Sequence, residues 1–357
     1  MSIVVDKSGP FTHAPTSVQR TMTLVLAALV PATLFDAWLF GWPAVFMFLT
    51  TIGSCVALEA LCLHLSNKPL EPTLTDGSAV LTGWLLAMSL PPWSPWWVCV
   101  IASIFAICLA KHVFGGLGQN VFNPAMVGRI AVLVSFPLQM TTWVAPLKAP
   151  GFAESLGITF GHPIGLDTVS AASALGYVKT ELSKGVPVSQ SMAEFAHQFP
   201  LSDMIVGVHP GSFGETSAVL VLLGGLFLLY KRIISWHIPV AVTGTLFVLG
   251  SLFSAVDPGR FTSGSFHLLS GATFLGAFFI ATDYVTSPVS KQGQLVYGFG
   301  IGFLTWIIRT FAGYPEGMAF AVLLMNALTP IIDHHIRPRA FGRTRKGEPL
   351  SLSKGES

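Results

Sequence analysis

The stretch TMTLVLAALVPATLFDAWLF, from Thr21 to Phe40, is followed almost at once by PAVFMFLTTIGSCVALEALCL, from Pro43 to Leu63. The first run has a single charged residue, Asp36, and the second has only Glu59. Each is about 20 residues long, which is the length of helix that crosses roughly 30 Å of hydrocarbon. Together they predict two membrane-spanning helices in succession.

The same pattern continues along the chain. Apolar residues make up 52% of the 357 residues and only 10% are charged, against roughly 25% in an ordinary soluble domain. The composition therefore predicts an all-α polytopic membrane protein with about ten transmembrane helices. The remaining apolar runs are Gly77 to Leu90, Pro95 to Ala110, Ala125 to Leu138, Glu215 to Tyr230, His237 to Phe253, Leu268 to Thr282, Leu295 to Ile308 and Met318 to Ile332.

The positions of the basic residues predict the orientation. Most of the 19 Lys and Arg residues fall on one side of the ten predicted helices, and basic residues beside membrane segments favour the cytoplasmic side. This rule places both termini in the cytoplasm and the long loop after the fifth helix outside. The predicted parts are a cytoplasmic N-terminus (1–20), a first transmembrane half (21–138), a periplasmic loop (139–213), a second transmembrane half (214–335) and a basic cytoplasmic tail (336–357).

A faint internal repeat relates the third and eighth apolar runs. Ala79 and Gly83 in the third run align without gaps with Ala272 and Gly276 in the eighth. Helices five apart run in opposite directions, so the repeat predicts two inverted five-helix halves with ligands between them. Both runs are also too short to cross a membrane unaided. Such broken helices are tolerated only where protein or a cavity supplies hydrogen-bond partners, which makes their ends candidate ligand sites.

A polar, glycine-rich stretch, FGGLGQNVFNP, separates the fourth and fifth runs. Glycine allows positive φ and a close backbone approach, and amide side chains supply donors and acceptors for a flat polar ring. The stretch lacks the Lys-Ser/Thr ending of a phosphate-binding loop. The alternative to a ring-binding site is an ordinary cytoplasmic turn. The candidate cofactor-binding residues are Gly115, Gly116, Gly118, Asn120 and Asn123.

Several acidic residues lie within or at the ends of apolar runs, where a charge is costly and tends to be functional. Glu59 and Asp283 are the leading candidates for a cation or proton path, with a structural hydrogen bond as the alternative for each. Asp36, beside Phe35 and Trp38, is expected near the hydrated outer interface. The full set is Asp36, Glu59, Glu215, Asp283 and Glu316. The four cysteines lack CxxC spacing, so no metal site is expected.

Longer motifs carry a family resemblance. The run from Lys111 to Met126, the stretch HLLSGATFLGAFFIATD from His267 to Asp283, and the Gly-Tyr-Pro sequence at Gly313 closely resemble the D subunits of Rnf complexes. The similarity extends to the B subunit of the sodium-translocating NADH:quinone reductase. It covers nearly the whole chain, and the long outer loop is the most divergent part. The resemblance implies a multi-pass protein of the bacterial inner membrane.

The resemblance also implies a covalent flavin. In that family a flavin transferase joins FMN through its phosphate to a threonine, in the pattern Asp-x-x-Ser/Thr-x-Ala-Thr. The outer loop here matches this pattern with Asp167, Ser170, Ala172 and, at the acceptor position, Ser173. Serine keeps the nucleophilic hydroxyl and loses only the methyl group that stiffens the threonine side chain. The alternative is an ordinary Ser/Ala-rich loop.

A second Ser-Gly-Ala-Thr sequence comprises Ser270, Gly271, Ala272 and Thr273. It is rejected as the attachment site because His267 stands where the pattern requires Asp. Small residues at the start of a membrane segment are expected to allow close helix packing, or to lie against a flavin ring.

The resemblance implies a subunit that relays electrons between ferredoxin and NAD through covalent FMN, coupled to Na⁺ or H⁺ translocation. No catalytic residue is assigned to the chain. The resemblance also allows a non-covalent flavin such as riboflavin among the helices. The expected partners are the A, B, C, E and G subunits of the Rnf complex, the flavin transferase and the lipid bilayer, and no nucleic acid. The competing hypotheses are a solute channel or carrier of urea-transporter-like architecture without flavin, and a redox-silent scaffold.

Overall fold

The computed structural model describes residues 17–71, 73–147, 150–161, 170–314 and 316–338. The described chain is predominantly helical, as expected, with one two-stranded sheet among its elements. Before the sheet come α1 (Val18–Phe40), α2 (Trp42–Leu65), α3 (Ser78–Ser89), α4 (Trp96–Ser103), η1 (Ile104–His112), α5 (Pro124–Ser135) and α6 (Pro137–Thr141).

The remaining elements continue the helical architecture. The antiparallel strands β1 (Trp143–Val144) and β2 (Ser170–Ala171) enclose α7 (Phe152–Phe160). After them come α8 (Ala174–Ser183), α9 (Val188–Gln198), α10 (Leu201–Val206), α11 (Ala218–Tyr230), α12 (His237–Val256), α13 (Gly264–Leu269), α14 (Thr273–Leu275), η3 (Gly276–Ile280), α15 (Lys291–Phe311) and α16 (Met318–His335).

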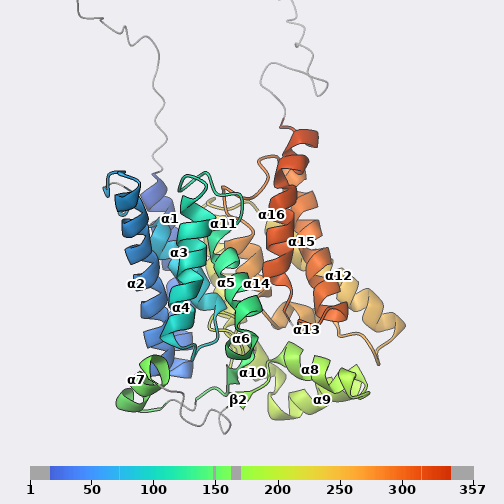
Figure 1. Ribbon diagram of the computed structural model, residues 1–357. Coiled ribbons are helices and arrows are strands. Elements are labelled where there is room, and N and C mark those ends of the chain that lie inside the picture. Colours follow the sequence, from blue (N-terminus) through green and yellow to red (C-terminus); the bar gives the residue numbers. More distant parts are fainter. Residues whose placement is uncertain (1–16, 72, 148–149, 162–169, 315, 339–357) are drawn as a thin grey trace, which may run out of the picture.

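Each of the ten apolar runs contains helix, although the run from Glu215 to Tyr230 becomes helical only at Ala218 and the eighth run is interrupted. Among the described helices, α1, α2 and α12 are long and apolar enough to cross a membrane, while α3, α4 with η1, α5 and α11 are apolar but shorter. The ten crossings and the inverted repeat therefore stay predictions. The halves of the chain interlock, since α11 packs against α1 and α5 against α16 (Figure 1).

The third run ends before Pro91, as the sequence indicated, whereas the break within the eighth run was not predicted. Helix α3 has 12 residues, begins after Gly77 at φ 83° and stops before Pro91. At 1.5 Å per residue it is about 18 Å long, well short of the hydrocarbon thickness. The eighth run is interrupted between α13 and α14 by Ser270, Gly271 and Ala272, with Gly271 at φ 69°.

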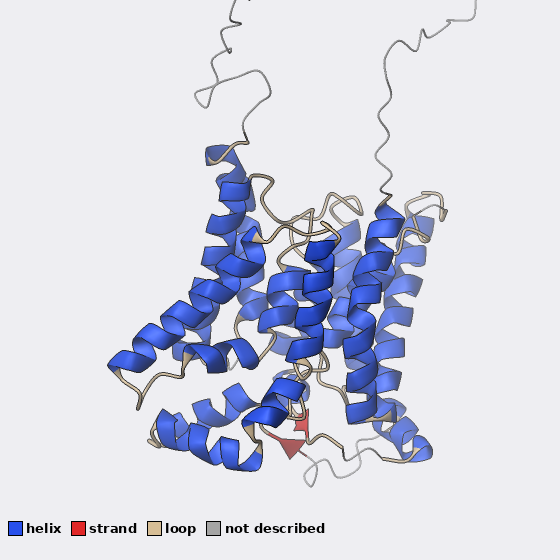
Figure 2. Ribbon diagram, turned by 180° about the vertical axis from the view of Figure 1, so that it is seen from behind, coloured by secondary structure: helices blue, strands red, loops and turns tan. Residues whose placement is uncertain are grey.

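The segment expected as an outer loop contains its own helices. Helices α7 to α10 and the small sheet lie at the end of the molecule opposite the start of α1 and the end of α16 (Figures 1 and 2). We call α8, α9 and α10 the outer helices. They share a small core with α13 that consists of Ala174, Val178, Val188, Phe195, Met204 and Phe266.

Two polar contacts hold the outer helices on the second half of the chain. The ammonium group of Lys179 in α8 donates to the carbonyl oxygens of Arg309 at 3.1 Å and Tyr314 at 2.9 Å, where α15 ends. The N–H of Val188 donates to the carbonyl oxygen of Gly259 at 2.8 Å. The start of α8 therefore has a defined position relative to the long helices.

Candidate functional site

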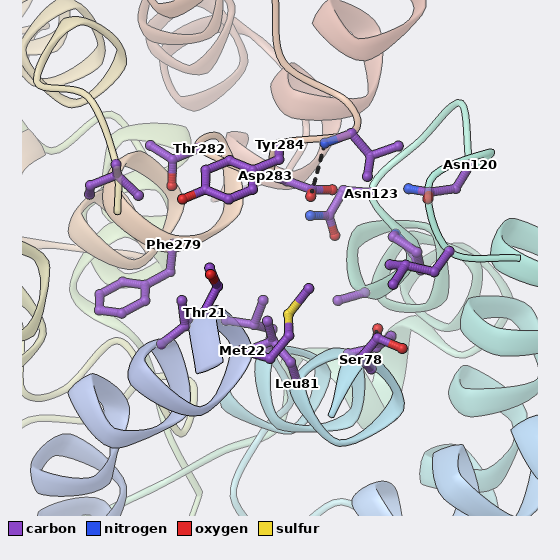
Figure 3. Close-up of a pocket in the computed structure, with 18 of the residues that line it drawn as sticks. Thr21, Met22, Ser78, Leu81, Asn120, Asn123, Phe279, Thr282, Asp283 and Tyr284 are labelled. Atoms are coloured by element: carbon purple, nitrogen blue, oxygen red, sulfur yellow. Dashed lines mark hydrogen bonds between the residues drawn. The ribbon is translucent and has the colours of Figure 1, made fainter. Parts of the chain in front are cut away.

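A cavity of about 100 Å³ lies at the end of the molecule where α1 begins and α16 ends. Its walls come from α1, α3, α11 and η3, and from the loops before α5 and after η3. Most of the lining is aliphatic or aromatic. Figure 3 shows Asn120, Asn123 and Asp283 on one side of the cavity, with Met22 and Leu81 on the other. We call this space the main cavity.

The polar side of the main cavity is built by the polar, glycine-rich loop. Asn123 is the N-cap of α5, and its Oδ1 accepts from the N–H of Met126 at 3.2 Å. The Nδ2 of Asn120 donates to the carbonyl oxygen of Phe122 at 3.1 Å. Gly115, Gly116 and Gly118 have φ of 120°, 110° and 87°, which only glycine adopts readily, but they do not line the cavity. The glycines shape the loop, and the two asparagines face the space.

Of the two leading acidic candidates, Asp283 borders the main cavity directly. It follows η3, and its carboxylate accepts from the hydroxyl of Thr286 at 3.2 Å and the N–H of Val285 at 3.4 Å (Figure 3). Glu59 is fully buried in α2. It accepts from the ammonium group of Lys111 at 2.7 Å, and Lys111 also donates to the hydroxyl of Ser78 at 2.7 Å.

A smaller niche of about 10 Å³ lies at the opposite end of the molecule, next to the outer helices. Its lining includes Ser173, His209, Glu215, Gly271 and Glu316. It is described below as the outer niche. Two sequence motifs that are almost 100 residues apart, the predicted flavin acceptor and the second Ser-Gly-Ala-Thr sequence, therefore meet at one place.

Ser173 is held at the start of a helix. It is the N-cap of α8, and its hydroxyl oxygen accepts from the N–H of Gly176 at 3.2 Å. Ser173 is 8% exposed, while its neighbour Ala172 is exposed. Ser170 lies in β2, and Asp167 lies outside the described residues. A helix N-terminus stabilises negative charge, so a phosphate ester on Ser173 would be favourably placed.

The second Ser-Gly-Ala-Thr sequence is organised by Arg309. The guanidinium group donates to the carbonyl oxygen of His267 at 2.8 Å, to the hydroxyl of Thr273 at 3.1 Å and to the carboxylate of Glu316 at 2.9 Å. Of the sequence's four residues, only Gly271 lines the outer niche, whereas Ser270, Ala272 and Thr273 are buried in packing. This geometry favours the packing alternative for those three residues.

Glu316 is the most completely bonded acid of the outer niche. Besides Arg309, its carboxylate accepts from the N–H groups of Gly317 at 3.0 Å and Met318 at 2.9 Å, at the start of α16. Burial alone would raise the pKa of Glu316, but Arg309 and the N–H of Met318 hold this pKa below its ordinary value. Glu316 is therefore a fixed anion that orders the loop between α15 and α16.

The two broken helices have matching surroundings. Ser78 opens α3 beside Lys111, which pairs with Glu59. At the other end of the molecule, Thr273 opens α14 beside Arg309, which pairs with Glu316. Each short helix thus begins next to a cation bound to a glutamate. Lys111 of the first pair lines the main cavity, and Glu316 of the second pair lines the outer niche.

The expectation for Asp36 was wrong. Asp36 is fully buried, and its Oδ1 accepts from the hydroxyl of Thr216 at 2.5 Å. Phe35 and Trp38 indicated its position near the outer end of α1. The sequence did not indicate that Thr216, 180 residues later, covers its carboxylate. Glu215 belongs to the acids in apolar runs, but the sequence favoured Glu59 and Asp283 as candidates for a cation or proton path. Its placement in the outer niche depends on contacts that sequence spacing does not show.

The chain matches the NQR2, RnfD, RnfE family over residues 5–342. It is 48% identical to a protein of Halorhodospira halophila, over 97% of this chain and 98% of the relative. It is 50% identical to a protein of Stutzerimonas stutzeri, over 95% of this chain and 96% of the relative. It is also 50% identical to a protein of Rhodobacter capsulatus, over 94% of each chain. The names of all three relatives describe them as the D subunit of an ion-translocating oxidoreductase complex.

Proposed function

Since this chain belongs to the NQR2, RnfD, RnfE family, we propose that it is the membrane flavoprotein subunit of an Rnf-type ion-translocating oxidoreductase complex. In this proposal it relays electrons between ferredoxin and NAD through FMN attached to Ser173, and this transfer is coupled to movement of Na⁺ or H⁺. The names of its relatives support membership in such a complex. Its partners are the A, B, C, E and G subunits, and a flavin transferase matures it.

The observation that carries the proposal is the position of Ser173. Its hydroxyl caps α8 at the end of the molecule opposite the start of α1 and the end of α16 (Figure 1), and the first turn of α8 offers N–H groups and the positive end of the helix dipole to a phosphate. FMN would supply one- and two-electron redox chemistry when attached there. The outer niche, at about 10 Å³, has room for about one water molecule, so the flavin ring would lie outside it.

The tie between α8 and α15 gives the attached group a defined place. Lys179 holds α8 against the carbonyl oxygens at the end of α15, so Ser173 is fixed relative to the long helices. A cofactor on a fixed anchor has a high effective concentration near its electron donor and acceptor. The chain's own task is therefore to place the anchor and set its electrostatic surroundings.

The main cavity suits a second, non-covalent flavin such as riboflavin. Asn120 and Asn123 present amide groups on one side, and Met22, Leu81 and Phe279 supply apolar surface for a flat ring. Most ligand sites combine an apolar lining with a few polar groups that set orientation, as here. Asp283 at the rim supports a cation or proton path beside this cavity.

The proposed topology places the protein in a bacterial inner membrane. Ten crossings in two inverted halves would put both termini in the cytoplasm and the outer helices in the periplasm. The outer helices lie at the end of the molecule opposite the start of α1 and the end of α16, which supports this arrangement (Figure 2). The matched ion pairs at the starts of α3 and α14 support the inverted halves, because inverted repeats place equivalent contacts at opposite ends.

Flavin fluorescence of the denatured chain tests the attachment. The chain is coexpressed with the remaining subunits and a flavin transferase, and the denatured band is examined for fluorescence in a gel. We expect a fluorescent wild-type band, a dark band for Ser173→Ala and a fluorescent band for Ser173→Thr, since threonine retains the hydroxyl. Ser183→Ala, at the far end of α8, is the matched control and should stay fluorescent.

A dark wild-type band in the matured complex would contradict the proposal. Fluorescence that persists in Ser173→Ala would place the attachment elsewhere in the chain. The alternative of a solute channel on a urea-transporter-like plan is favoured by one observation, the mainly apolar cavity between the halves beside a broken helix. That alternative predicts a dark band together with solute flux into vesicles that contain this chain alone.

A further inference from the structure

Residues 209–217, here called the buried connector, link the outer helices to α11. Its backbone is not helical, yet every residue from His209 to Ser217 is buried. The N–H groups of Phe213 and Gly214 donate to the carbonyl oxygens of Leu90 at 3.0 Å and Met88 at 2.6 Å, so the connector is paired to the end of α3. Irregular backbone at such depth is tolerated where it is enclosed by protein or lines a cavity.

The buried connector is rich in polar side chains that lack hydrogen-bond partners. Within the described residues, this is true of His209 Nε2, Ser212 Oγ, Glu215 Oε1 and Ser217 Oγ. Asp36 Oδ2 also lacks a hydrogen-bond partner among the described residues, while the hydroxyl of Thr216 in the connector donates to the other oxygen of Asp36. A buried polar atom without a partner destabilises the folded state. Four such atoms in one nine-residue connector, with a fifth on the aspartate that the connector bonds, indicate a site that holds water or an ion.

Glu215 is the acid of the buried connector itself, and its charge is only partly compensated. Its Oε2 accepts a long hydrogen bond from the N–H of Ser212 at 3.3 Å, and its Oε1 lies 3.8 Å from Arg129, too far for a hydrogen bond. Arg129 donates instead to the carbonyl oxygen of Ser89. Glu316 across the outer niche, by contrast, accepts from a guanidinium group and backbone N–H groups at 2.9–3.1 Å.

The side chains of Glu215 and Thr216 lie beside the turn at Gly211. A Cβ placed on Gly211 would lie 3.3 Å from Glu215 Oε2 and 3.7 Å from the methyl group of Thr216, so these two side chains sit on the same side of the turn. Thr216 in turn contacts Asp36. Glu215 itself lines the outer niche beside Ser173 and His209, which gives a route from the outer end of the molecule.

We propose that Glu215 and the hydroxyl groups of the buried connector bind a small monovalent cation, Na⁺ or a proton, at the end of the molecule that carries Ser173. Either cation would neutralise the weakly paired carboxylate, which is only 6% exposed. The inference does not depend on attached flavin.

The electrostatic setting of Glu215 comes from several elements. Arg129 of α5 is the nearest cation, and Glu316 before α16 repels across the niche. Arg309 of α15 compensates Glu316. His209 belongs to the buried connector itself, and Asp36 of α1 adds a second carboxylate through Thr216. With the carboxylate of Glu215 on the connector, that of Asp36 bonded to Thr216, and one cation at 3.8 Å from Glu215, taking up one positive charge restores balance.

The test uses the purified, fully assembled complex in Na⁺-free buffer. Equilibrium binding of ²²Na⁺ and the infrared band of protonated carboxylic acid are measured across pH for wild type, Glu215→Gln and Glu154→Gln. Glu154, an exposed acid of α7, is the matched control. If the cation is Na⁺, Glu215→Gln binds one Na⁺ fewer per complex than wild type. If it is a proton, Na⁺ binding is equal and a titrating carboxylic-acid band is lost in Glu215→Gln.

Either of those results, with Glu154→Gln unchanged, supports the site and identifies the cation. Equal Na⁺ binding together with an identical infrared titration in wild type and Glu215→Gln would overturn the proposal. If Glu215→Gln does not assemble, Glu215→Asp replaces it, because aspartate keeps the charge and shortens the reach. Its cation affinity or carboxyl titration should shift from wild type, and unchanged behaviour would refute the role of Glu215.

Discussion

At the scale of single residues, the chemistry of this protein depends on how completely each buried charge is matched. Lys111 and Glu59 satisfy each other at 2.7 Å, and Arg309 and Glu316 do so at 2.9 Å. The nearest cation to Glu215 is Arg129, at 3.8 Å from its carboxylate. Breaking a buried pair leaves an uncompensated charge and costs about 3–5 kcal/mol, so fully matched pairs serve structure. An incompletely matched acid is free to exchange a cation.

Gly271 gives a prediction at this scale. It has φ 69°, and a Cβ at this position would collide with the carboxylate of Glu316. Gly271→Ala should therefore lower the stability of the protein by about 1–3 kcal/mol, through backbone strain and displacement of Glu316. The measurement is the thermal unfolding midpoint in detergent. Gly313→Ala is the control, since a Cβ there meets nothing within 4 Å, and an equal drop in both variants would contradict the explanation.

At the scale of elements, α8 is the helix that brings the predicted acceptor to its place. Its core residues pack against α9 and α13, and Lys179 caps the end of α15. Burial lowers the pKa of Lys179, but three carbonyl oxygens surround its ammonium group and compensate in part for the lost water. The contact therefore ties the outer helices to the long helices six residues after Ser173.

Replacing this contact should loosen α8. Lys179→Met keeps the apolar stem and removes the charge, so amide hydrogen exchange in Ala174–Ser183 should become about tenfold faster, corresponding to roughly 1.4 kcal/mol. Lys184→Met is the matched control, because Lys184 is exposed and pairs only with Glu181 within α8 in the described structure. Exchange that is equally fast in both variants would show that the apolar contacts alone hold α8.

At the scale of the whole molecule, the two ends differ in chemistry. The end with the main cavity carries the start of α1 and the end of α16, and the other end carries the outer helices (Figure 1). In the proposed orientation these ends face the cytoplasm and the periplasm. The outer niche and the buried connector then form a polar entrance on the periplasmic side, while Asn120, Asn123 and Asp283 border a cavity on the cytoplasmic side.

Cysteine labelling tests the orientation. In a background with Cys62 and Cys108 replaced by Ser, a membrane-impermeant maleimide applied to cells with a permeabilised outer membrane should label Lys184→Cys and not Ser66→Cys. Both residues are exposed, and they lie at opposite ends of the molecule. Cys55 and Cys99 are buried and should not react. Inverted inner-membrane vesicles should give the reverse pattern, and the same pattern in both preparations would refute the topology.

The sequence by itself determined the helical architecture and the end of the third apolar run. Apolar run length and the position of Pro91 are local properties, and they set where helices begin and end without reference to distant residues. Only the tertiary structure decided three other features. They are the shared niche of Ser173 and Gly271, the hydrogen bond from Thr216 that covers Asp36, and the weak pairing of Glu215 with Arg129. Each depends on residues tens to hundreds of positions apart, whose proximity follows from the packing of helices that one sequence does not specify.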